Sequence, residues 1–360
     1  MEQEFVKWVA SIKKRYKQSQ IKAAIRVNSE LIAFYFNLGK EISESSFKKK
    51  YGNSFFKVLS NELKKDSRNF AGFSQRNLAY IESFYILYKK ILQQVVAKFQ
   101  QVVGELPEKI QNKEISQQVA AQLFMVPWGH HTIIINKCKN NAKKAWFYIN
   151  KIIENGWSRS TLDLYISSNL YEREGKAITN FEITLPKEES DHIQQLTKDP
   201  YCFDFFEARD DYNEKEIKDT LVRNIKRVLL ELGTGFAFVG QEYRVIVGES
   251  EFYIDLLFYN IPLHSYVVIE VKSTKFKPEY LGQLGLYVSA IDHNIKNDKD
   301  GKTIGLLICK EKDNVVAQYS LENFSIPLGI SSFELSKLLL EEYKSSLPTI
   351  EELEAELKTK

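Results

Sequence analysis

The sequence predicts an α-helical first half of the helix-turn-helix type, followed by an α/β second half built on a mixed sheet flanked by helices. Apolar residues in the first half recur every three or four positions, which is the period of amphipathic helices. In the second half, short runs of β-branched and aromatic residues alternate with helical segments. The length of 360 residues suits two domains, at about 100 to 200 residues each.

Charge is divided unequally between the two halves. Residues 1–180 hold 29 Lys and Arg against 15 Asp and Glu, a net charge of +14, whereas residues 181–360 hold 21 against 32, a net charge of −11. A strongly basic domain is typical of proteins that bind a polyanion. We therefore expect DNA as the partner of the first half, and no residue distinguishes DNA from RNA. Apolar helices in this half also leave homo-oligomer formation open.

Composition argues against a membrane or secreted protein. The chain has 44% hydrophobic and 27% charged residues, and no window approaches an unbroken apolar span. Four basic residues interrupt the first fifteen positions before a signal-peptide core forms, namely Lys7, Lys13, Lys14 and Arg15. The three cysteines form no C-x-x-C pair. We expect a cytoplasmic protein without a membrane partner.

Four segments are predicted along the chain. Residues 1–170 form a basic helical domain for DNA binding or oligomerisation, and 171–202, with Pro186 and Pro200, form a linker. Residues 203–345 form the α/β domain, and 346–360 an acidic tail.

The first half contains a repeated corner motif. Helices are predicted over 5–42 and 55–65, with Gly39 and Gly52 as interruptions. The pattern Gly, aromatic, Ser, three polar residues, Leu occurs at 72–78 and again at 156–162. In each copy the Gly ends one helix, the aromatic residue packs into the turn and the Ser caps the next helix.

The residues after each capping Ser are candidate DNA contacts. In a helix-turn-helix, the first turn of the second helix faces the major groove, and Gln75, Arg76 and Asn77 can all bond to base edges. Arg159 has the corresponding place in the second copy. The alternative is a solvated first turn in a helical bundle with two similar corners.

The second half is predicted as helix, strands, helix, strand. Asn213 and Glu216 form a capping-box pattern that opens a helix ending at Gly233. Strands are expected over 235–239, 243–247, 252–259, 266–272 and 303–309, and further helices over 278–292 and 334–343.

Two of these strands carry charges at positions that should be buried. Asp255 lies among six apolar or aromatic neighbours, and Glu270 and Lys272 project from one face of the next strand. A buried carboxylate costs several kcal/mol unless it is paired or bound to a metal. The loop containing Asn260 turns one strand back on the other, so we expect Asp255 and Glu270 to meet.

Paired carboxylates favour a hard cation such as Mg²⁺, with Mn²⁺ as a substitute. Bound to Asp255 and Glu270, the metal would lower the pKa of a water molecule and neutralise charge on a phosphodiester. Lys272 would orient or deprotonate that water. The alternative is an ion pair that closes a strand edge.

These residues resemble the PD-(D/E)xK nuclease superfamily of restriction-endonuclease type. The pattern consists of Asp255, the run Glu270-Val271-Lys272, and a Q-x-x-x-Y element formed by Gln283 and Tyr287. A closer resemblance, covering nearly the whole chain, is to the bacterial YhcG-like nuclease family, carried by the segments 72–78, 157–162, 229–240, 253–259 and 278–284.

The resemblance implies metal binding by Asp255 and Glu270, catalysis by Lys272 and positioning by Gln283. Lys275 and Lys277, just past the motif, are expected to hold the scissile DNA strand.

Many superfamily members add an acid from the first helix. Three candidates remain open here, as does the choice between one metal and two: Glu214, Glu216 and Asp219.

The expected function is that of a Mg²⁺-dependent DNA endonuclease, a deoxyribonuclease whose first half binds DNA. The alternative is a catalytically inactive DNA-binding adaptor that retains the nuclease fold.

Overall fold

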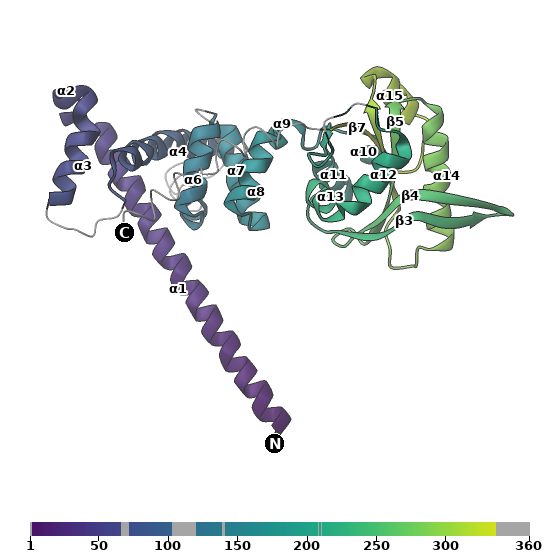
Figure 1. Ribbon diagram of the computed structural model, residues 1–360, viewed down its shortest axis with the longest axis horizontal. Coiled ribbons are helices and arrows are strands. Elements are labelled where there is room, and N and C mark those ends of the chain that lie inside the picture. The colour runs from purple at the N-terminus through teal and green to yellow at the C-terminus, as the bar shows by residue number, and fades with distance from the viewer. Residues whose placement is uncertain are drawn as a thin grey trace. The chain divides into compact units, whose positions relative to one another are not determined.

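The computed structural model describes residues 2–65, 72–102, 120–138, 141–207, 209 and 211–335. The predicted acidic tail, 346–360, lies outside them. The chain divides into two compact units between Ile166 and Ser167 (Figure 1), and each is described by itself. Within the described residues, no helix combines the length and the hydropathy needed to cross a membrane.

The N-terminal unit is helical, as the apolar period predicts. Its helices are α1 (Glu2–Glu44), α2 (Phe47–Tyr51), α3 (Phe55–Lys65), α4 (Gln75–Val102), α6 (Trp128–Cys138), α7 (Ala142–Asn155) and α8 (Arg159–Ser167). Gly39 was expected to interrupt the first helix, but it lies inside α1. A Cβ atom at Gly39 would be 2.3 Å from the carbonyl oxygen of Ile81. Gly39 therefore allows α1 and α4 to pack closely.

Both copies of the corner motif form helix starts. Gly72 and Gly156 have φ of +117° and +62°, in the region that favours glycine. The Ser74 hydroxyl accepts a hydrogen bond from the Asn77 N–H at 3.2 Å, and Ser158 accepts one from the Thr161 N–H at 3.1 Å. The Ser cap is confirmed in both copies, and the Gly stop is confirmed at Gly156, which follows the last residue of α7. The residues directly before Gly72 lie outside the described part of the chain.

The C-terminal unit is an α/β sandwich around a mixed sheet, as predicted. Within the described residues the strands follow the order β1-β7-β6-β5-β4-β3, with β2 beside β7. Pairs β3–β4 and β4–β5 are antiparallel, while β5–β6 and β6–β7 are parallel. The strands are β1 (Ile178–Thr179), β2 (Tyr201–Cys202), β3 (Phe236–Val247), β4 (Ser250–Asn260), β5 (Ser265–Lys275), β6 (Ile304–Glu311) and β7 (Leu328–Glu334).

Helices cover both faces of this sheet, and the hairpin of β3 and β4 projects beyond it (Figure 1). The helices of this unit are α9 (Leu170–Arg173), α10 (Phe181–Thr184), α11 (Lys187–Leu196), α12 (Glu214–Arg223), α13 (Ile225–Leu232), α14 (Glu279–Asn294) and α15 (Asn314–Leu321). Ile217 on α12 packs in one apolar core with Val271 of β5, and Leu284 on α14 packs in a second core with Val268.

The prediction that residues 171–202 form a linker is wrong. This segment forms short helices and strands, and its residues Phe181, Ile193 and Tyr201 are at most 1% exposed in the core on the α12 side of the sheet. Pro186 favoured the linker prediction because proline is common in loops. Proline is also common at helix starts, and here Pro186 directly precedes α11.

Three other element boundaries differ from the predictions. The helix expected from Asn213 to Gly233 breaks at Asn224 into α12 and α13. The two strands expected over 235–247 form the single strand β3, with a register shift between Phe238 and Gly240. Glu334, expected to begin a helix, ends β7, and the rest of that segment lies outside the described residues.

Candidate active site

The site lies where β4 and β5 separate. Their paired residues end at Leu256 and Ile269, so Asp255 is the first residue beyond the ladder. Its Oδ2 accepts a hydrogen bond from the Val271 N–H at 3.0 Å. Ile254 and Leu256 lie in different cores although they are two residues apart, so the strand alternation breaks at Asp255. The carboxylate thus occupies the fork between the strands.

Glu270 and Lys272 project from β5 into the same place. Glu270 is 1% exposed, and the Lys272 ammonium donates to its Oε1 at 2.9 Å. The other oxygen, Oε2, is buried without a hydrogen-bond partner in the described part of the chain. An unpaired buried carboxylate oxygen is costly, which points to a missing ligand.

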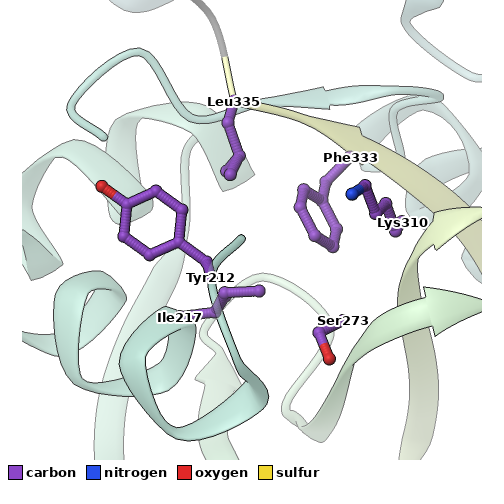
Figure 2. Close-up of a pocket in the computed structure, with 6 residues that line it drawn as sticks. All are labelled: Tyr212, Ile217, Ser273, Lys310, Phe333 and Leu335. Atoms are coloured by element: carbon purple, nitrogen blue, oxygen red, sulfur yellow. The ribbon is translucent and has the colours of Figure 1, made fainter. Parts of the chain in front are cut away.

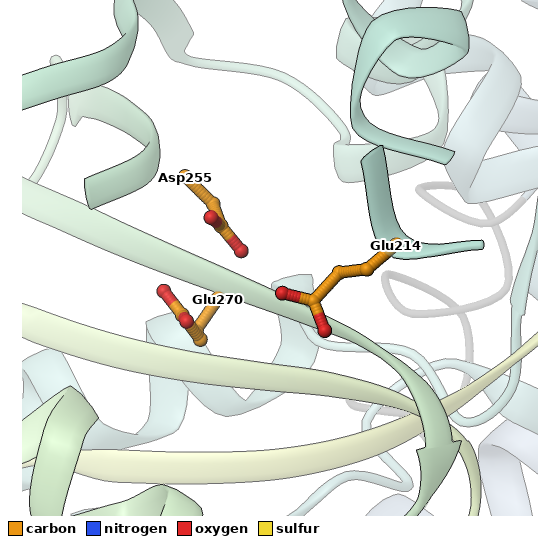
Figure 3. Close-up of side chains that lie close together, drawn as sticks. All are labelled: Glu214, Asp255 and Glu270. Atoms are coloured by element: carbon orange, nitrogen blue, oxygen red, sulfur yellow. The ribbon is translucent and has the colours of Figure 1, made fainter. Parts of the chain in front are cut away.

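Glu214, the first residue of α12, joins the two strand acids. Carboxylate oxygens of Glu214, Asp255 and Glu270 lie within 4.8 Å of one another (Figure 3). We call these three residues the acidic cluster. Lys272 Nζ lies 3.2 Å from Glu214 Oε1. The expected convergence of Asp255 and Glu270 is therefore present, and it includes a helix acid.

The structure decides between the three helix acids that the sequence left open. Glu216 closes the capping box with Asn213, accepting its N–H at 3.0 Å, and its other oxygen pairs with Arg209 at 2.6 Å. Asp219 is not in the acidic cluster, which is the group of acids at metal-binding distance found among the described residues. The available signal was that Glu214 lies three positions before the buried Ile217, near the apolar face of the helix.

A second lysine, Lys218, enters the cluster and was missed by the sequence reasoning. Its ammonium donates to Asp255 Oδ1 at 2.8 Å and lies 4.0 Å from Glu214 Oε1. Lys218 follows Glu214 by four residues, so both share one helix face. That spacing was readable in the sequence, but the contact with Asp255 was not.

Helix α14 presents the Q-x-x-x-Y element to this site. The Gln283 amide donates to the Tyr287 hydroxyl at 2.8 Å. Burial raises the pKa of Tyr287, the hydrogen bond from Gln283 opposes this, and the charges of Glu270 and Asp255 add to the increase. The Tyr280 ring, which the sequence reasoning also missed, lies 5.5 Å from the Lys272 ammonium.

The charges of the site shift the pKa values of Glu270 and Lys272. Burial raises the pKa of Glu270 to about 7, the charge of Asp255 adds to the increase, and Lys272 opposes it. Burial lowers the pKa of Lys272, but the hydrogen bond and charge of Glu270, followed by Glu214, outweigh this and raise it above its ordinary value. Lys272 is therefore an ammonium group suited to stabilising negative charge.

The donor set fits a hard divalent cation. All candidate ligand atoms are carboxylate oxygens, the kind that Mg²⁺ and Mn²⁺ prefer. The unpartnered Oε2 of Glu270 is the observation that distinguishes the cluster from three acids satisfied by lysines alone.

A small hollow lies on the α12 side of the sheet, and no acid of the cluster lines it. Ser273 directly follows Lys272, and Ile217 directly precedes Lys218. Figure 2 shows the rings of Tyr212 and Phe333 on opposite sides of the hollow. Its lining residues are Tyr212, Ile217, Ser273, Lys310, Phe333 and Leu335.

The predicted DNA contacts of the C-terminal unit are exposed. Lys275 ends β5, and Lys277 lies in the loop before α14 with its Nζ 3.9 Å from Glu279. Neither is brought into the acidic cluster.

In the N-terminal unit, Gln75, Arg76 and Arg159 are exposed at the first turns of α4 and α8. Asn77 is different, because its amide donates to the Gly72 carbonyl and its Oδ1 accepts the Trp128 indole N–H at 2.8 Å. The polar atoms of Asn77 therefore hold the corner together, and its contact with a base stays a prediction.

The start of α6 joins the two corners. Trp128 bonds to Asn77 of the first corner, and His130 Nε2 bonds to the Trp157 carbonyl of the second at 2.9 Å. Between them, Gly129 has no side chain, and a Cβ there would lie 2.8 Å from Arg159 Cδ. The first turns of α4 and α8 are therefore both packed against one turn of α6.

The sheet and the acidic cluster are those of a PDDEXK-type nuclease domain. Residues 194–348 match the YhcG PDDEXK nuclease domain, and residues 11–173 match the DUF1016 N-terminal domain. The chain is therefore similar to the YhcG-like nucleases over two separate regions, a helical N-terminal region and a PDDEXK nuclease domain.

A relative and two solved structures complete the comparison. The chain is 28% identical over 347 residues to the protein named "Putative nuclease YhcG" of Escherichia coli strain K12, covering 92% of this chain and 88% of the relative. A repair endonuclease from Pyrococcus abyssi and an EndoMS–dsDNA2 complex are each 17% identical, with TM-scores of 0.26 and 0.25. They cover 37% and 38% of this chain, which spans 50% and 48% of their lengths.

Proposed function

We propose that this protein is a Mg²⁺-dependent DNA endonuclease whose C-terminal unit hydrolyses phosphodiester bonds and whose N-terminal unit binds DNA. The observation that carries the proposal is the buried, unpartnered Oε2 of Glu270 within an acidic cluster next to Lys272. The match of residues 194–348 to a PDDEXK nuclease domain supports the same chemistry.

Asp255 and Glu270 would hold the metal, and Glu214 adds negative charge beside them. A divalent ion bound there supplies a water of lowered pKa and neutralises charge on the phosphodiester. Lys272, as an ammonium group, stabilises the negative charge that develops on the phosphate. Gln283 donates to Tyr287 and lies on the helix facing the cluster, where it positions the substrate. Lys275 and Lys277 hold the scissile strand.

The test is cleavage of duplex and single-stranded DNA, and of RNA, in a Mg²⁺ titration. Asp255→Ala and Lys272→Ala should each lower the rate at least about 100-fold, because even a side chain that only orients a metal ligand contributes 10- to 100-fold. Asp219→Asn, on the same helix but outside the cluster, is the matched control and should cleave normally. Cleavage unaffected by both active-site changes would defeat the enzyme proposal. DNA binding without cleavage in any form would favour the adaptor.

DNA binding by the N-terminal unit is supported by the packing of two corners against α6. The exposed side chains of Arg76 and Arg159 start helices, where N–H groups and the helix dipole favour phosphate. The Arg76→Gln/Arg159→Gln variant of the full chain should lower the slope of log affinity against log salt by about 2, one for each lost phosphate contact.

Lys143→Gln is the matched control for this measurement. Lys143 is an exposed base on α7, thirteen residues before Gly156 and hence about 20 Å from the second corner at 1.5 Å per residue. Equal salt slopes for the double variant and the control would show that the two corners do not contact DNA phosphates.

A further inference from the structure

The contacts of Lys218 leave room for one cation in the acidic cluster rather than two. Its ammonium lies between two carboxylates, 2.8 Å from Asp255 Oδ1 and 4.0 Å from Glu214 Oε1. Only about a fifth of the side chain is exposed, at 20%. Lys218 is thus held inside the cluster rather than resting on its rim.

Most carboxylate oxygens that face the cluster already have a partner. Asp255 Oδ1 accepts from Lys218 and Oδ2 from the Val271 N–H. The Lys272 ammonium donates hydrogen bonds to Glu270 Oε1 and Glu214 Oε1. Within the acidic cluster of the described chain, Glu270 Oε2 is the buried oxygen left without a partner. The cluster therefore has an open position beside Glu270 and a filled one between Asp255 and Glu214.

The net charge of the cluster also indicates one cation rather than two. The three carboxylates contribute −3, and the ammonium groups of Lys218 and Lys272 contribute +2, so the described cluster carries −1 when all are ionised. One divalent ion changes this to +1. A second would raise it to +3 within a few ångströms of two ammonium groups, where like charges in a partly buried site repel strongly.

We infer that the centre takes a single divalent cation on the Glu270 side, and that the Lys218 ammonium takes the place of a second cation between Asp255 and Glu214. This inference rests on the proposed metal-dependent function and specifies its cation count. Lys218 is accordingly a positioning residue: it holds Asp255 and Glu214 together by a charge that no change in metal concentration removes.

The test counts Mn²⁺ bound to the full chain without DNA, by electron paramagnetic resonance of the free ion. Wild type should bind one ion. Lys218→Gln keeps a donor for Asp255 but removes the charge, so it should bind a second ion. Lys218→Arg keeps the charge and should bind one. The double variant Glu214→Gln/Lys218→Gln should return to one, because the second position then lacks a carboxylate. Circular dichroism melting checks that each variant folds.

The outcomes separate this inference from the proposed function. Wild-type protein that binds no Mn²⁺, or binds it equally well after Asp255→Ala, overturns both. One ion in both wild type and Lys218→Gln, or two ions in wild type, overturns the role of Lys218 and leaves the nuclease proposal standing. A second ion bound to Lys218→Arg also overturns the role of Lys218, because the second position would then accept an ion although the positive charge is still present.

As a second readout, the Mg²⁺ dependence of cleavage should change with the variant. Wild type should follow a single-site curve with a Hill coefficient near one, and Lys218→Gln a steeper curve. A steeper curve in wild type counts against the inference.

Discussion

Replacing Glu270 by Gln should remove a pH dependence from the stability of the C-terminal unit. Glu270 is 1% exposed, and its pKa is raised to about 7 by burial and by the charge of Asp255. Gln has nearly the same shape but does not ionise. The difference between the two proteins across the pH range therefore isolates the cost of ionising this one carboxyl.

The sign follows from the raised pKa. Between pH 4.5 and pH 7 the folded protein keeps a proton on Glu270 that the unfolded chain has released. The stability from this group is therefore fully present below pH 4.5 and lost as pH rises through about 7. A shift of about 2.5 pH units at about 1.4 kcal/mol each gives about 3.5 kcal/mol. Relative to Glu270→Gln, the metal-free wild type should lose about that free energy of unfolding between pH 4 and pH 8.

The assay is urea denaturation in the presence of a chelator, with hydrogen exchange of β4 and β5 as the probe. All four tryptophans, Trp8, Trp128, Trp146 and Trp157, precede residue 167, so their fluorescence reports on the N-terminal unit and serves as an internal control. Glu249→Gln, an exposed acid in the β3–β4 turn, is the matched variant and should follow the wild type. Parallel pH curves for wild type and Glu270→Gln would refute the reasoning. Adding Mg²⁺ at pH 8 should stabilise the wild type by mass action and leave Glu270→Gln less affected.

Two further changes test the packing inside each unit. Gly39→Ala should lower the free energy of unfolding of the N-terminal unit by about 1 to 3 kcal/mol, read by tryptophan fluorescence, because its Cβ would meet a backbone oxygen of α4 at 2.3 Å; unchanged stability would show that α1 and α4 separate freely. Glu231→Gln should destabilise the C-terminal unit by about 3 to 5 kcal/mol, read by hydrogen exchange of β4 and β5 in urea, because it leaves Arg173, 4% exposed at its side chain, without its counter-charge. Glu251→Gln, which breaks an exposed pair with Arg244, should cost under about 1 kcal/mol by the same measurement, and equal losses for the two pairs would contradict the argument from burial.

The local sequence determined much of this protein. The Ser74, Ser158 and Asn213 caps follow from hydrogen bonds within three residues, so pattern alone located those helix starts. Asp255 and Glu270 meet because a short loop pairs β4 with β5, and the two acids lie opposite each other just beyond the last paired residues. Fold class and the strand acids of the site were therefore readable before any coordinates.

Other parts depended on contacts between residues far apart in the chain. Asn77 was a candidate base contact in the sequence, but its amide oxygen accepts a hydrogen bond from Trp128, 51 residues away. The segment 171–202 resembled a linker because its short elements have little pattern of their own and gain stability only by packing in the core.

In the acidic cluster, too, the sequence determined some residues and the tertiary structure determined the others. From the sequence, Glu214, Glu216 and Asp219 were three open candidates on one helix, with Glu214 nearest its apolar face, and Lys218 was one lysine among many. The packing of α12 over the fork in the sheet selected Glu214 and brought Lys218 to Asp255, 37 residues further along the chain. A helix's position on a sheet is set by the fit of many apolar side chains at once, which no short pattern encodes. Thus the sequence alone determined which strands carry the acids, and the tertiary structure alone decided which helix charges complete them.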